Sequence, residues 1–349
     1  MRTLLFKLFG LGIVAVSLVV GWSWMSLNNF ANSPVQAGEK GIEFVVPAGA
    51  GLIRVANQLE NDGVISSARY FRWLARLEGL TTRIQAGEYQ IESGTTALGL
   101  LQLFASGKVK QYTLTIIEGW TFHQMLRLVH EHPKLTHSLK GKTDADIMRA
   151  IGREGEHPEG RFLPDTYHFP AGTTDVQFLQ RAYNALQDVL EKSWAGRDQN
   201  LPLANAYEAL ILASIVEKET AVSSERGQIA GVFTRRLIKR MRLQTDPTVI
   251  YGMGDKYDGN IRRRDLKNDT PYNTYTRFGL PPTPIALSSA ASIEAAVHPE
   301  DGDSLYFVAK GDGSHHFSAT VEEHNKAVRK YQLRRSKDYR STPEATNLK

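Results

Sequence analysis

The sequence predicts a mixed α+β protein with an N-terminal membrane-length helix, a small α+β module and a larger α+β domain. Three observations lead to this prediction. An uncharged apolar run stands near the N-terminus, a strand, glycine turn and helix pattern occurs three times after it, and a later apolar run ends abruptly in two acids. With 349 residues, 42% of them hydrophobic and 23% charged, the chain is long enough for two globular parts of ordinary composition.

The first apolar run, residues 8–27, contains no charge and follows two basic residues. Twenty helical residues cross the hydrocarbon core of a bilayer, and Trp22 and Trp24 fall near the far end, where aromatic residues gather at the membrane interface. We therefore expect residues 1–28 to form a cytoplasmic tip and a retained single-pass anchor in the inner membrane, with the rest of the chain in the periplasm. A cleaved signal peptide is the competing interpretation, because residues 35–37 resemble a cleavage site.

Composition limits the partners and cofactors. The net charge of +5 is scattered, with clusters of arginine only at 235–236, 262–264 and 334–335. No aromatic-basic signature of RNA recognition accompanies them, so we expect no nucleic-acid partner, and an anionic envelope polymer or membrane surface accounts for the charge. The absence of cysteine excludes disulfides, thiol nucleophiles and cysteine-ligated zinc. The ten histidines form no metal motif, so no metal and no other cofactor is expected.

A weak internal repeat follows the anchor. Residues 44–59, 89–104 and 114–129 each have the pattern of a strand, a glycine-containing turn and an amphipathic helix. We expect these three segments to fold as the same local unit, two of them inside the small module and one at the start of the larger domain.

The small module is predicted over residues 41–110, after a polar linker at residues 29–40. Between the first two repeats, residues 68–80 predict a helix whose apolar stripe includes Tyr70 and Trp73, and these rings are expected to pack in the core. The order strand, helix, helix, strand resembles a LysM-type glycan-binding module. A structural spacer that holds the larger domain off the membrane explains the same pattern equally well.

The later apolar run, residues 210–216, predicts an enclosed helix because its side chains point in almost every direction at 100° per residue. Glu217 and Glu219 end the run at an edge of the core. Glu219 lies in line with three large apolar residues, so burial should raise its pKa and let it hold a proton for general-acid chemistry. Alternatively, both glutamates are solvated residues of a last helical turn.

The segments after these acids predict a polar and aromatic surface. A helix at residues 223–240 is expected to carry its basic residues, Arg236 among them, opposite an apolar face. Residues 270–276 and 279–285 predict rigid loops with hydroxyl, amide and aromatic groups, which are the groups that sugar sites use. Residues 159–170 contain one glycine and two prolines, and either line such a site or form a packed connector.

Four motifs carry a resemblance to a known family. They are Leu212-Ala-Ser-Ile-Val-Glu-Lys-Glu-Thr220, Arg242-Leu-Gln-Thr-Asp-Pro-Thr-Val-Ile-Tyr251, Pro271-Tyr-Asn-Thr-Tyr275 and Gly279-Leu-Pro-Pro282. With these segments the chain resembles the endolytic murein transglycosylase family (MltG, YceG-like) from the anchor to about Tyr331. The motifs around Glu219 also resemble those of lysozyme-like transglycosylases.

The resemblance implies cleavage of the β-1,4 bond between N-acetylmuramic acid and N-acetylglucosamine in peptidoglycan glycan strands, with 1,6-anhydromuramyl ends as products. It implies that Glu219 is the catalytic group, first as general acid and then as base. It further implies a catalytic domain at residues 111–333 with a lysozyme-like helical centre. An enzyme that terminates nascent strands would work beside peptidoglycan synthases. Residues 334–349 are expected to be a disordered polar tail.

Several side chains are candidates for the site around Glu219. Glu217 is expected to be a supporting neighbour, and Asp246 has a second interpretation as the cap of the next helix. Two other functions stay open: a hydrolytic muramidase with Asp246 or Glu217 as partner acid, and a non-enzymatic, membrane-tethered glycan-binding scaffold in which Glu219 is structural. The candidates for substrate binding are Thr220, Gln244, Asp246, Tyr272, Asn273 and Tyr275.

Overall fold

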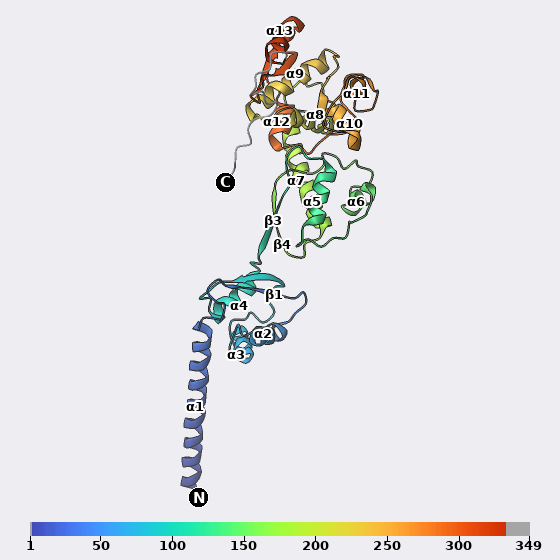
Figure 1. Cartoon of the computed structure of the whole chain (residues 1–349). Helices are drawn as coiled ribbons and strands as arrows, with labels where there is room; N and C mark the ends of the chain where they lie inside the picture. Colours follow the sequence, from blue (N-terminus) through green and yellow to red (C-terminus); the bar gives the residue numbers. More distant parts are fainter. Residues whose placement is uncertain (1, 333–349) are drawn as a thin grey trace. The chain divides into compact units, whose positions relative to one another are not determined.

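The computed structural model describes residues 2–332 and shows a mixed α+β chain with small two-stranded sheets (Figure 1). The predicted tail at residues 334–349 lies outside this part of the chain. The chain divides into two compact units. The first contains the residues up to Tyr112 and the short segment His168–Gly172, and the second contains Thr113–Tyr167 and the residues from Thr173 on.

The N-terminal helix α1 (Arg2–Asn32) is longer than the predicted anchor. Its last turns belong to the core of the first unit, where Leu27 and Phe30 are buried. The first residues of the predicted linker at 29–40 are thus the end of this helix, and the residues that follow them contact the first unit. The Val35 N–H donates to the Thr95 carbonyl at 2.8 Å, and both Val35 and Ala37 are buried.

The first unit has the predicted order of strand, helix, helix and strand. Strands β1 (Ile42–Val46) and β2 (Gly87–Ile91) pair antiparallel, with Phe44 opposite Tyr89. Both rings point into the core, where they pack on Phe104 with centroid distances of 5.7 and 4.8 Å. The helices of this unit are α2 (Leu52–Asn61), α3 (Ala68–Leu77) and α4 (Ala97–Ser106).

The predicted repeat is confirmed in all three places. Each copy runs from a strand through a turn to a helix, and each turn contains a glycine with φ near +75° (Gly49, Gly94 and Gly119) that other residues rarely adopt. In the second and third copies, a threonine hydroxyl accepts a backbone N–H at the start of the helix. The same sequence pattern therefore has the same local structure at all three positions.

Helix α3 differs from its prediction on one side. Ser67 caps the helix, and Phe71 and Leu74 are buried as the apolar stripe predicts. Tyr70 and Trp73 are partly buried and pack against the core as predicted, whereas Leu77 is 61% exposed. Part of the apolar stripe therefore faces away from the core of this unit.

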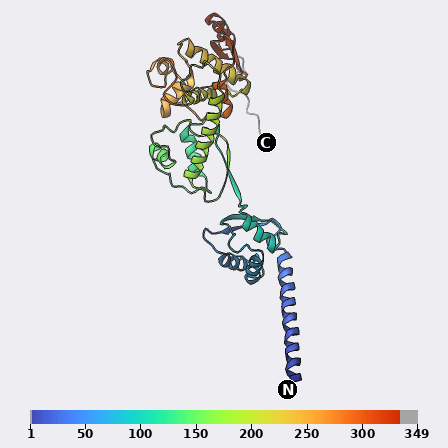
Figure 2. The same ribbon diagram turned by 180° about the vertical axis from the view of Figure 1, so that it is seen from behind.

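In the second unit, α8 (Ala206–Glu219) packs against α7, α9, α10 and α12, and both views show these helices gathered around it (Figures 1 and 2). Its residues 209–216 are all buried, which confirms the predicted enclosed helix. Strands β5 and β6 of this unit pair antiparallel, with Phe307 opposite Phe317. Strand β3 pairs with β4, and each of these two strands has residues in both units. The other elements from β3 on are β3 (Gln111–Thr115), α5 (Phe122–Glu131), α6 (Asp144–Ala150), β4 (Thr166–Pro170), α7 (Asp175–Gly196), α9 (Arg226–Ile238), α10 (Asp246–Met253), α11 (Arg263–Lys267), α12 (Ala290–Val297), β5 (Tyr306–Ala309), β6 (His315–Ser318) and α13 (Val321–Tyr331).

Candidate active site

Glu219 is the last residue of α8, and Thr220 is the C-cap of the helix. The enclosed part of the helix stops three residues earlier, so the Glu219 side chain lies at the rim of the core and is partly exposed. The helix is fixed against the loop that passes beside it, because the Ser214 hydroxyl accepts the Ile285 N–H at 3.0 Å. The structure therefore places the half-buried Glu219 at the edge of the core, as its helical position predicts.

A buried cluster of threonines holds the partner of this carboxylate. The Thr245 hydroxyl donates a hydrogen bond to the Glu219 Oε1 atom. Thr245 is positioned by its own N–H, which donates to the Thr274 Oγ1 atom at 3.1 Å, and the Thr248 and Thr274 hydroxyls lie 2.8 Å apart. All three threonines are buried. None was predicted, because a hydroxyl that bonds across the fold has no periodic signature in the sequence.

The surroundings of Glu219 hold its carboxyl in a state suited to proton transfer. Burial raises the pKa of Glu219 to about 7, and the negative charge of Asp246 adds to the rise. The Thr245 hydrogen bond and the Arg236 charge act in the opposite direction. Near neutral pH, the carboxyl is therefore divided between its protonated and ionised forms.

Arg236 corrects one prediction. It lies on α9 but not on a solvated basic face: it is buried, its Nε atom donates to the Leu305 carbonyl at 2.7 Å, and its Nη1 atom donates to the Leu243 carbonyl at 2.7 Å. The reason is that α9 packs against α8, α12 and β5, so more than one of its sides is covered. Burial lowers the pKa of Arg236, and its charge acts on Glu219. Arg236 is thus a buried cation behind the candidate acid.

Asp246 and Tyr275 form a pair beside Glu219. The Tyr275 hydroxyl donates to the Asp246 Oδ1 atom at 2.6 Å. Asp246 is exposed and is the first residue of α10 rather than its cap, since Thr245 occupies the N-cap position. Burial, together with the Asp246 carboxylate, raises the pKa of Tyr275 above its ordinary value. Gln244 lies two residues before Asp246, and its side chain is exposed. Its φ of 49° is a left-handed conformation that costs energy for a residue other than glycine.

The remaining three binding candidates have their polar atoms engaged within the protein. The buried Asn273 side chain donates to the backbone carbonyls of residues 265, 266 and 268, and its Oδ1 atom accepts the Tyr275 N–H at 2.9 Å. The Tyr272 hydroxyl lies 2.9 Å from the Thr283 hydroxyl. The buried Thr220 hydroxyl accepts the Val222 N–H at 2.9 Å. These residues shape the loops around Glu219.

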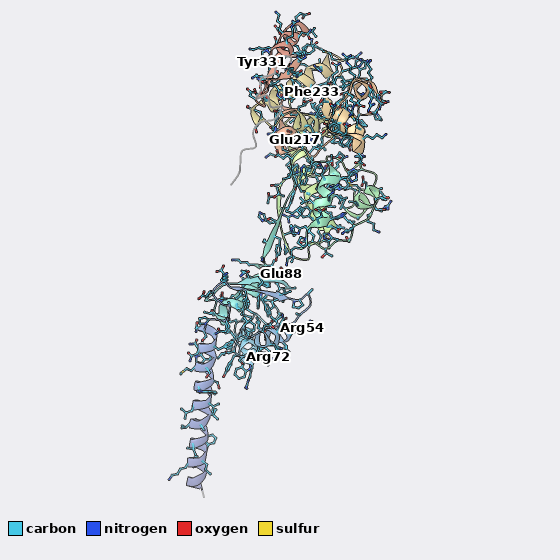
Figure 3. All side chains as sticks on the ribbon, viewed as in Figure 1. Arg54, Arg72, Glu88, Glu217, Phe233 and Tyr331 are labelled. Atoms are coloured by element: carbon cyan, nitrogen blue, oxygen red, sulfur yellow. The ribbon has the colours of Figure 1, made fainter. Side chains whose placement is uncertain are left out.

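The two acids that end α8 have different environments. The side chain of Glu217 is 5% exposed, and its Oε2 atom accepts hydrogen bonds from the N–H and the hydroxyl of Ser289 at 2.9 and 2.5 Å. Its Oε1 atom lies 3.5 Å from the Arg226 guanidinium. Glu217, which is labelled in Figure 3, therefore joins the end of α8 to the start of α12.

A carboxyl with a raised pKa also lies in the 159–170 segment, which is buried at Glu159, Phe162 and Leu163 and ends in strand β4. Glu159 is buried and accepts the Phe122 N–H at 2.9 Å, at the start of α5. Burial raises the pKa of Glu159 to about 7, and the Tyr251 hydroxyl acts in the opposite direction. The Tyr251 ring packs edge-on against Tyr272 at 4.8 Å. The only sequence signal for Glu159 was its position before a glycine in a proline-containing segment.

One exposed aromatic side chain also lies near the candidate residues in the chain. Phe278 is exposed, three residues after Tyr275, and the Arg242 guanidinium lies 4.7 Å from the centre of its ring. Arg242 is two residues before Gln244. This exposed ring was not predicted as part of the site.

Among the residues that the structure describes, no group of three or more His, Asp or Glu side chains could hold a metal ion.

The chain is similar to known proteins over most of its length. The model of the YceG-like family matches residues 44–330. A Bacillus subtilis protein named endolytic murein transglycosylase is 29% identical over 90% of this chain and 91% of its own length. A Streptococcus pneumoniae protein of the same name is 27% identical over 84% of this chain, which spans 59% of that longer protein. The crystal structure of a yceG-like protein from Listeria monocytogenes, 32% identical, superposes with a TM-score of 0.51 and covers 82% of this chain and 98% of its own. The chain belongs to the YceG-like family.

Proposed function

We propose that this chain is a membrane-anchored lytic transglycosylase that cleaves the β-1,4 bond between N-acetylmuramic acid and N-acetylglucosamine in peptidoglycan. The observation that carries the proposal is Glu219: a partly exposed carboxyl at the end of an enclosed helix, with a pKa raised to about 7 and a neutral hydroxyl as its hydrogen-bond donor. The names of the relatives from B. subtilis and S. pneumoniae support the same substrate and an internal position of cleavage.

In the proposed reaction, one carboxyl acts twice. Protonated Glu219 gives its proton to the glycosidic oxygen as the bond to the muramyl C1 atom breaks through an oxocarbenium-like state. The resulting carboxylate takes the proton of the muramyl C6 hydroxyl as that oxygen bonds to C1. No water is consumed, and Glu219 regains its proton. A pKa of about 7 suits both steps, because neither form of the carboxyl is strongly disfavoured at neutral pH.

The proposed sugar contacts come from side chains that remain at least partly exposed to solvent. Gln244 and Asp246 are exposed, and the partly exposed Tyr275 donates its hydroxyl proton to Asp246. The exposed ring of Phe278 offers a flat face of the kind on which a pyranose stacks. Thr220, Tyr272 and Asn273 are proposed as positioning residues, since their polar atoms already bond within the protein.

The test is Glu219→Gln in the full chain, with mass spectrometry of the muropeptides released from isolated sacculi. We expect anhydromuramyl ends from the parent and no release by the variant, with unchanged thermal unfolding and sacculus binding. Equal release by the variant would leave glycan binding as the function and contradict the proposal.

A muramidase is the second candidate, because the charge of Asp246 acts on Glu219 and a nearby carboxylate is what a hydrolytic enzyme needs to activate water. Reducing muramic ends in the parent digest, abolished in Asp246→Asn, would establish this function instead. We expect anhydro ends, and we expect Asp246→Asn to retain activity.

We further propose that α1 is a retained anchor in the inner membrane, with the rest of the chain in the periplasm beside peptidoglycan synthases. Removal of a signal peptide after Ala37 would take Leu27, Phe30 and Val35 out of the core of the first unit. N-terminal sequencing of the protein from a membrane fraction tests this. A start at residue 38 would contradict it, and co-purification without any synthase would contradict the partner.

A further inference from the structure

Helix α1 defines a level along the chain at which the membrane surface should lie. Residues 6–32 are long and apolar enough to cross a bilayer. If Lys7 marks the cytoplasmic edge, the twenty residues that follow it span about 30 Å, which is the thickness of the hydrocarbon core. Leu27 then lies at the opposite edge, at the height of the lipid headgroups. This step rests on the anchorage proposed above.

Helix α3 lies at this same level, because it packs against the end of α1. Leu27 lines a cavity of about 250 Å³ together with Trp73, Arg76 and Leu77. The contact between α1 and α3 also includes three aromatic rings. The ring centres of Phe30 and Tyr70 are 5.7 Å apart, and those of Tyr70 and Trp73 are 6.4 Å apart. The side chains of α3 that touch Leu27 are therefore placed where α1 leaves the membrane.

The surface of α3 has the chemistry of a membrane interface. The helix contains Arg69, Arg72 and Arg76 and no acidic residue. Leu77 is 61% exposed, and Trp73 is partly exposed with the Arg69 guanidinium 4.8 Å from its ring. Aromatic and aliphatic side chains with arginines around them are typical of helices that lie in the plane of a membrane surface. Arg72 is labelled on this unit in Figure 3.

We propose that α3 docks on the periplasmic surface of the membrane that α1 spans. Trp73 and Leu77 lie at the boundary of the hydrocarbon, and the three arginines bind anionic lipid headgroups, which attract basic residues next to a membrane helix. The small unit thus has two membrane contacts, one spanning and one interfacial. The exposure of Leu77, which the apolar stripe of the sequence does not predict, follows from this second contact.

The test uses the full chain in lipid nanodiscs. Because the chain contains no cysteine, single spin labels can be placed without other changes. We choose Leu77→Cys, Ile53→Cys on α2 as a control with the same 61% exposure, and Val16→Cys within α1, which is 63% exposed. Collision rates with oxygen report lipid, and collision rates with a water-soluble nickel complex report water.

In discs that contain phosphatidylglycerol, we expect the Leu77 label to have an oxygen-to-nickel ratio several-fold above that of the Ile53 label. A ratio equal to that of Ile53 while the Val16 label is in lipid would overturn the docking of α3 alone. A Val16 label exposed to water would instead contradict the anchorage. A Leu77 label shielded from both reagents would indicate a protein contact and would also overturn the proposal.

The charged part of the contact is tested separately. Changing Arg69, Arg72 and Arg76 together to glutamine should lower the oxygen-to-nickel ratio of the Leu77 label in discs with phosphatidylglycerol to its value in phosphatidylcholine alone. The Ile53 and Val16 labels should not change. A ratio that is the same in both lipids for the parent arginines would overturn the role of anionic headgroups.

Discussion

Replacing Thr245 by valine removes the hydroxyl that donates a hydrogen bond to the Glu219 carboxylate, with little change in side-chain volume. The bond favours the ionised form of Glu219, so its loss raises the pKa of that carboxyl. A hydrogen bond to a charged group contributes about 1.5–3 kcal/mol, and one pKa unit corresponds to about 1.4 kcal/mol. The pKa of Glu219 should therefore rise from about 7 by roughly one to two units.

The direction in which the pH profile should shift follows from the role of Glu219 as an acid. Activity falls on the alkaline side as Glu219 loses its proton, so a higher pKa moves that limb of the pH profile to higher pH. The assay is kcat/KM for release of anhydromuropeptides from sacculi by the purified full chain, measured between pH 5 and about pH 9, the range over which the expected limbs fall.

Thr248→Val is the matched control for this experiment. It removes a hydroxyl from the same buried cluster, but that hydroxyl bonds to Thr245 and Thr274 and not to Glu219. It should lower the free energy of unfolding and leave the alkaline limb in place. An unchanged limb in Thr245→Val, or the same shift in both variants, would refute the assignment of that limb to Glu219.

Three further variants test other parts of the site. Asp246→Asn removes a charge that raises the pKa of Glu219, so the alkaline limb of kcat/KM should move to lower pH, opposite to Thr245→Val; a shift to higher pH would contradict the proposed electrostatics. Glu217→Gln weakens the bonds to Ser289, and chemical denaturation should show a loss of about 2–3 kcal/mol in the free energy of unfolding with kcat little changed. Glu159 binds its proton more tightly in the folded than in the unfolded chain, since its pKa rises from 4.5 to about 7. The contribution of Glu159 to the free energy of unfolding is therefore fully present below pH 4.5 and falls by about 3 kcal/mol as the pH rises to 7. In Glu159→Gln, the free energy of unfolding measured at several pH values should lack this decrease.

Patterns that repeat along the chain predicted the parts of the fold that depend on local sequence. The enclosed helix before Glu219 and the three strand, turn and helix units follow from apolar periodicity and from glycines in turns. The burial of Arg236 could not be predicted in this way, because the carbonyl that its Nε atom reaches is 69 residues away. The burial of Val35 could not be predicted either, since Val35 bonds to Thr95, which lies far from it in the sequence.

In the candidate site, too, some features could be predicted from the sequence and others could not. The helical position of Glu219 relative to its apolar neighbours favoured a raised pKa, although solvated glutamates in a last helical turn stayed an alternative. The sequence could not distinguish side chains that face a substrate from those that hold the loops, and Asn273 shows why. An amide is chemically suited to both tasks, and only the carbonyls that surround its side chain decide which task it performs.

The continuity of α1 into the core of the first unit has a consequence for how this unit is oriented. A flexible tether would let it rotate freely, whereas a continuous helix fixes its angle about the axis of α1. Each residue inserted between Trp22 and Leu27 would turn the unit by about 100° and lift it by about 1.5 Å. In the anchorage proposed above, the length of α1 therefore sets the rotation of the unit about the helix axis as well as its height above the bilayer.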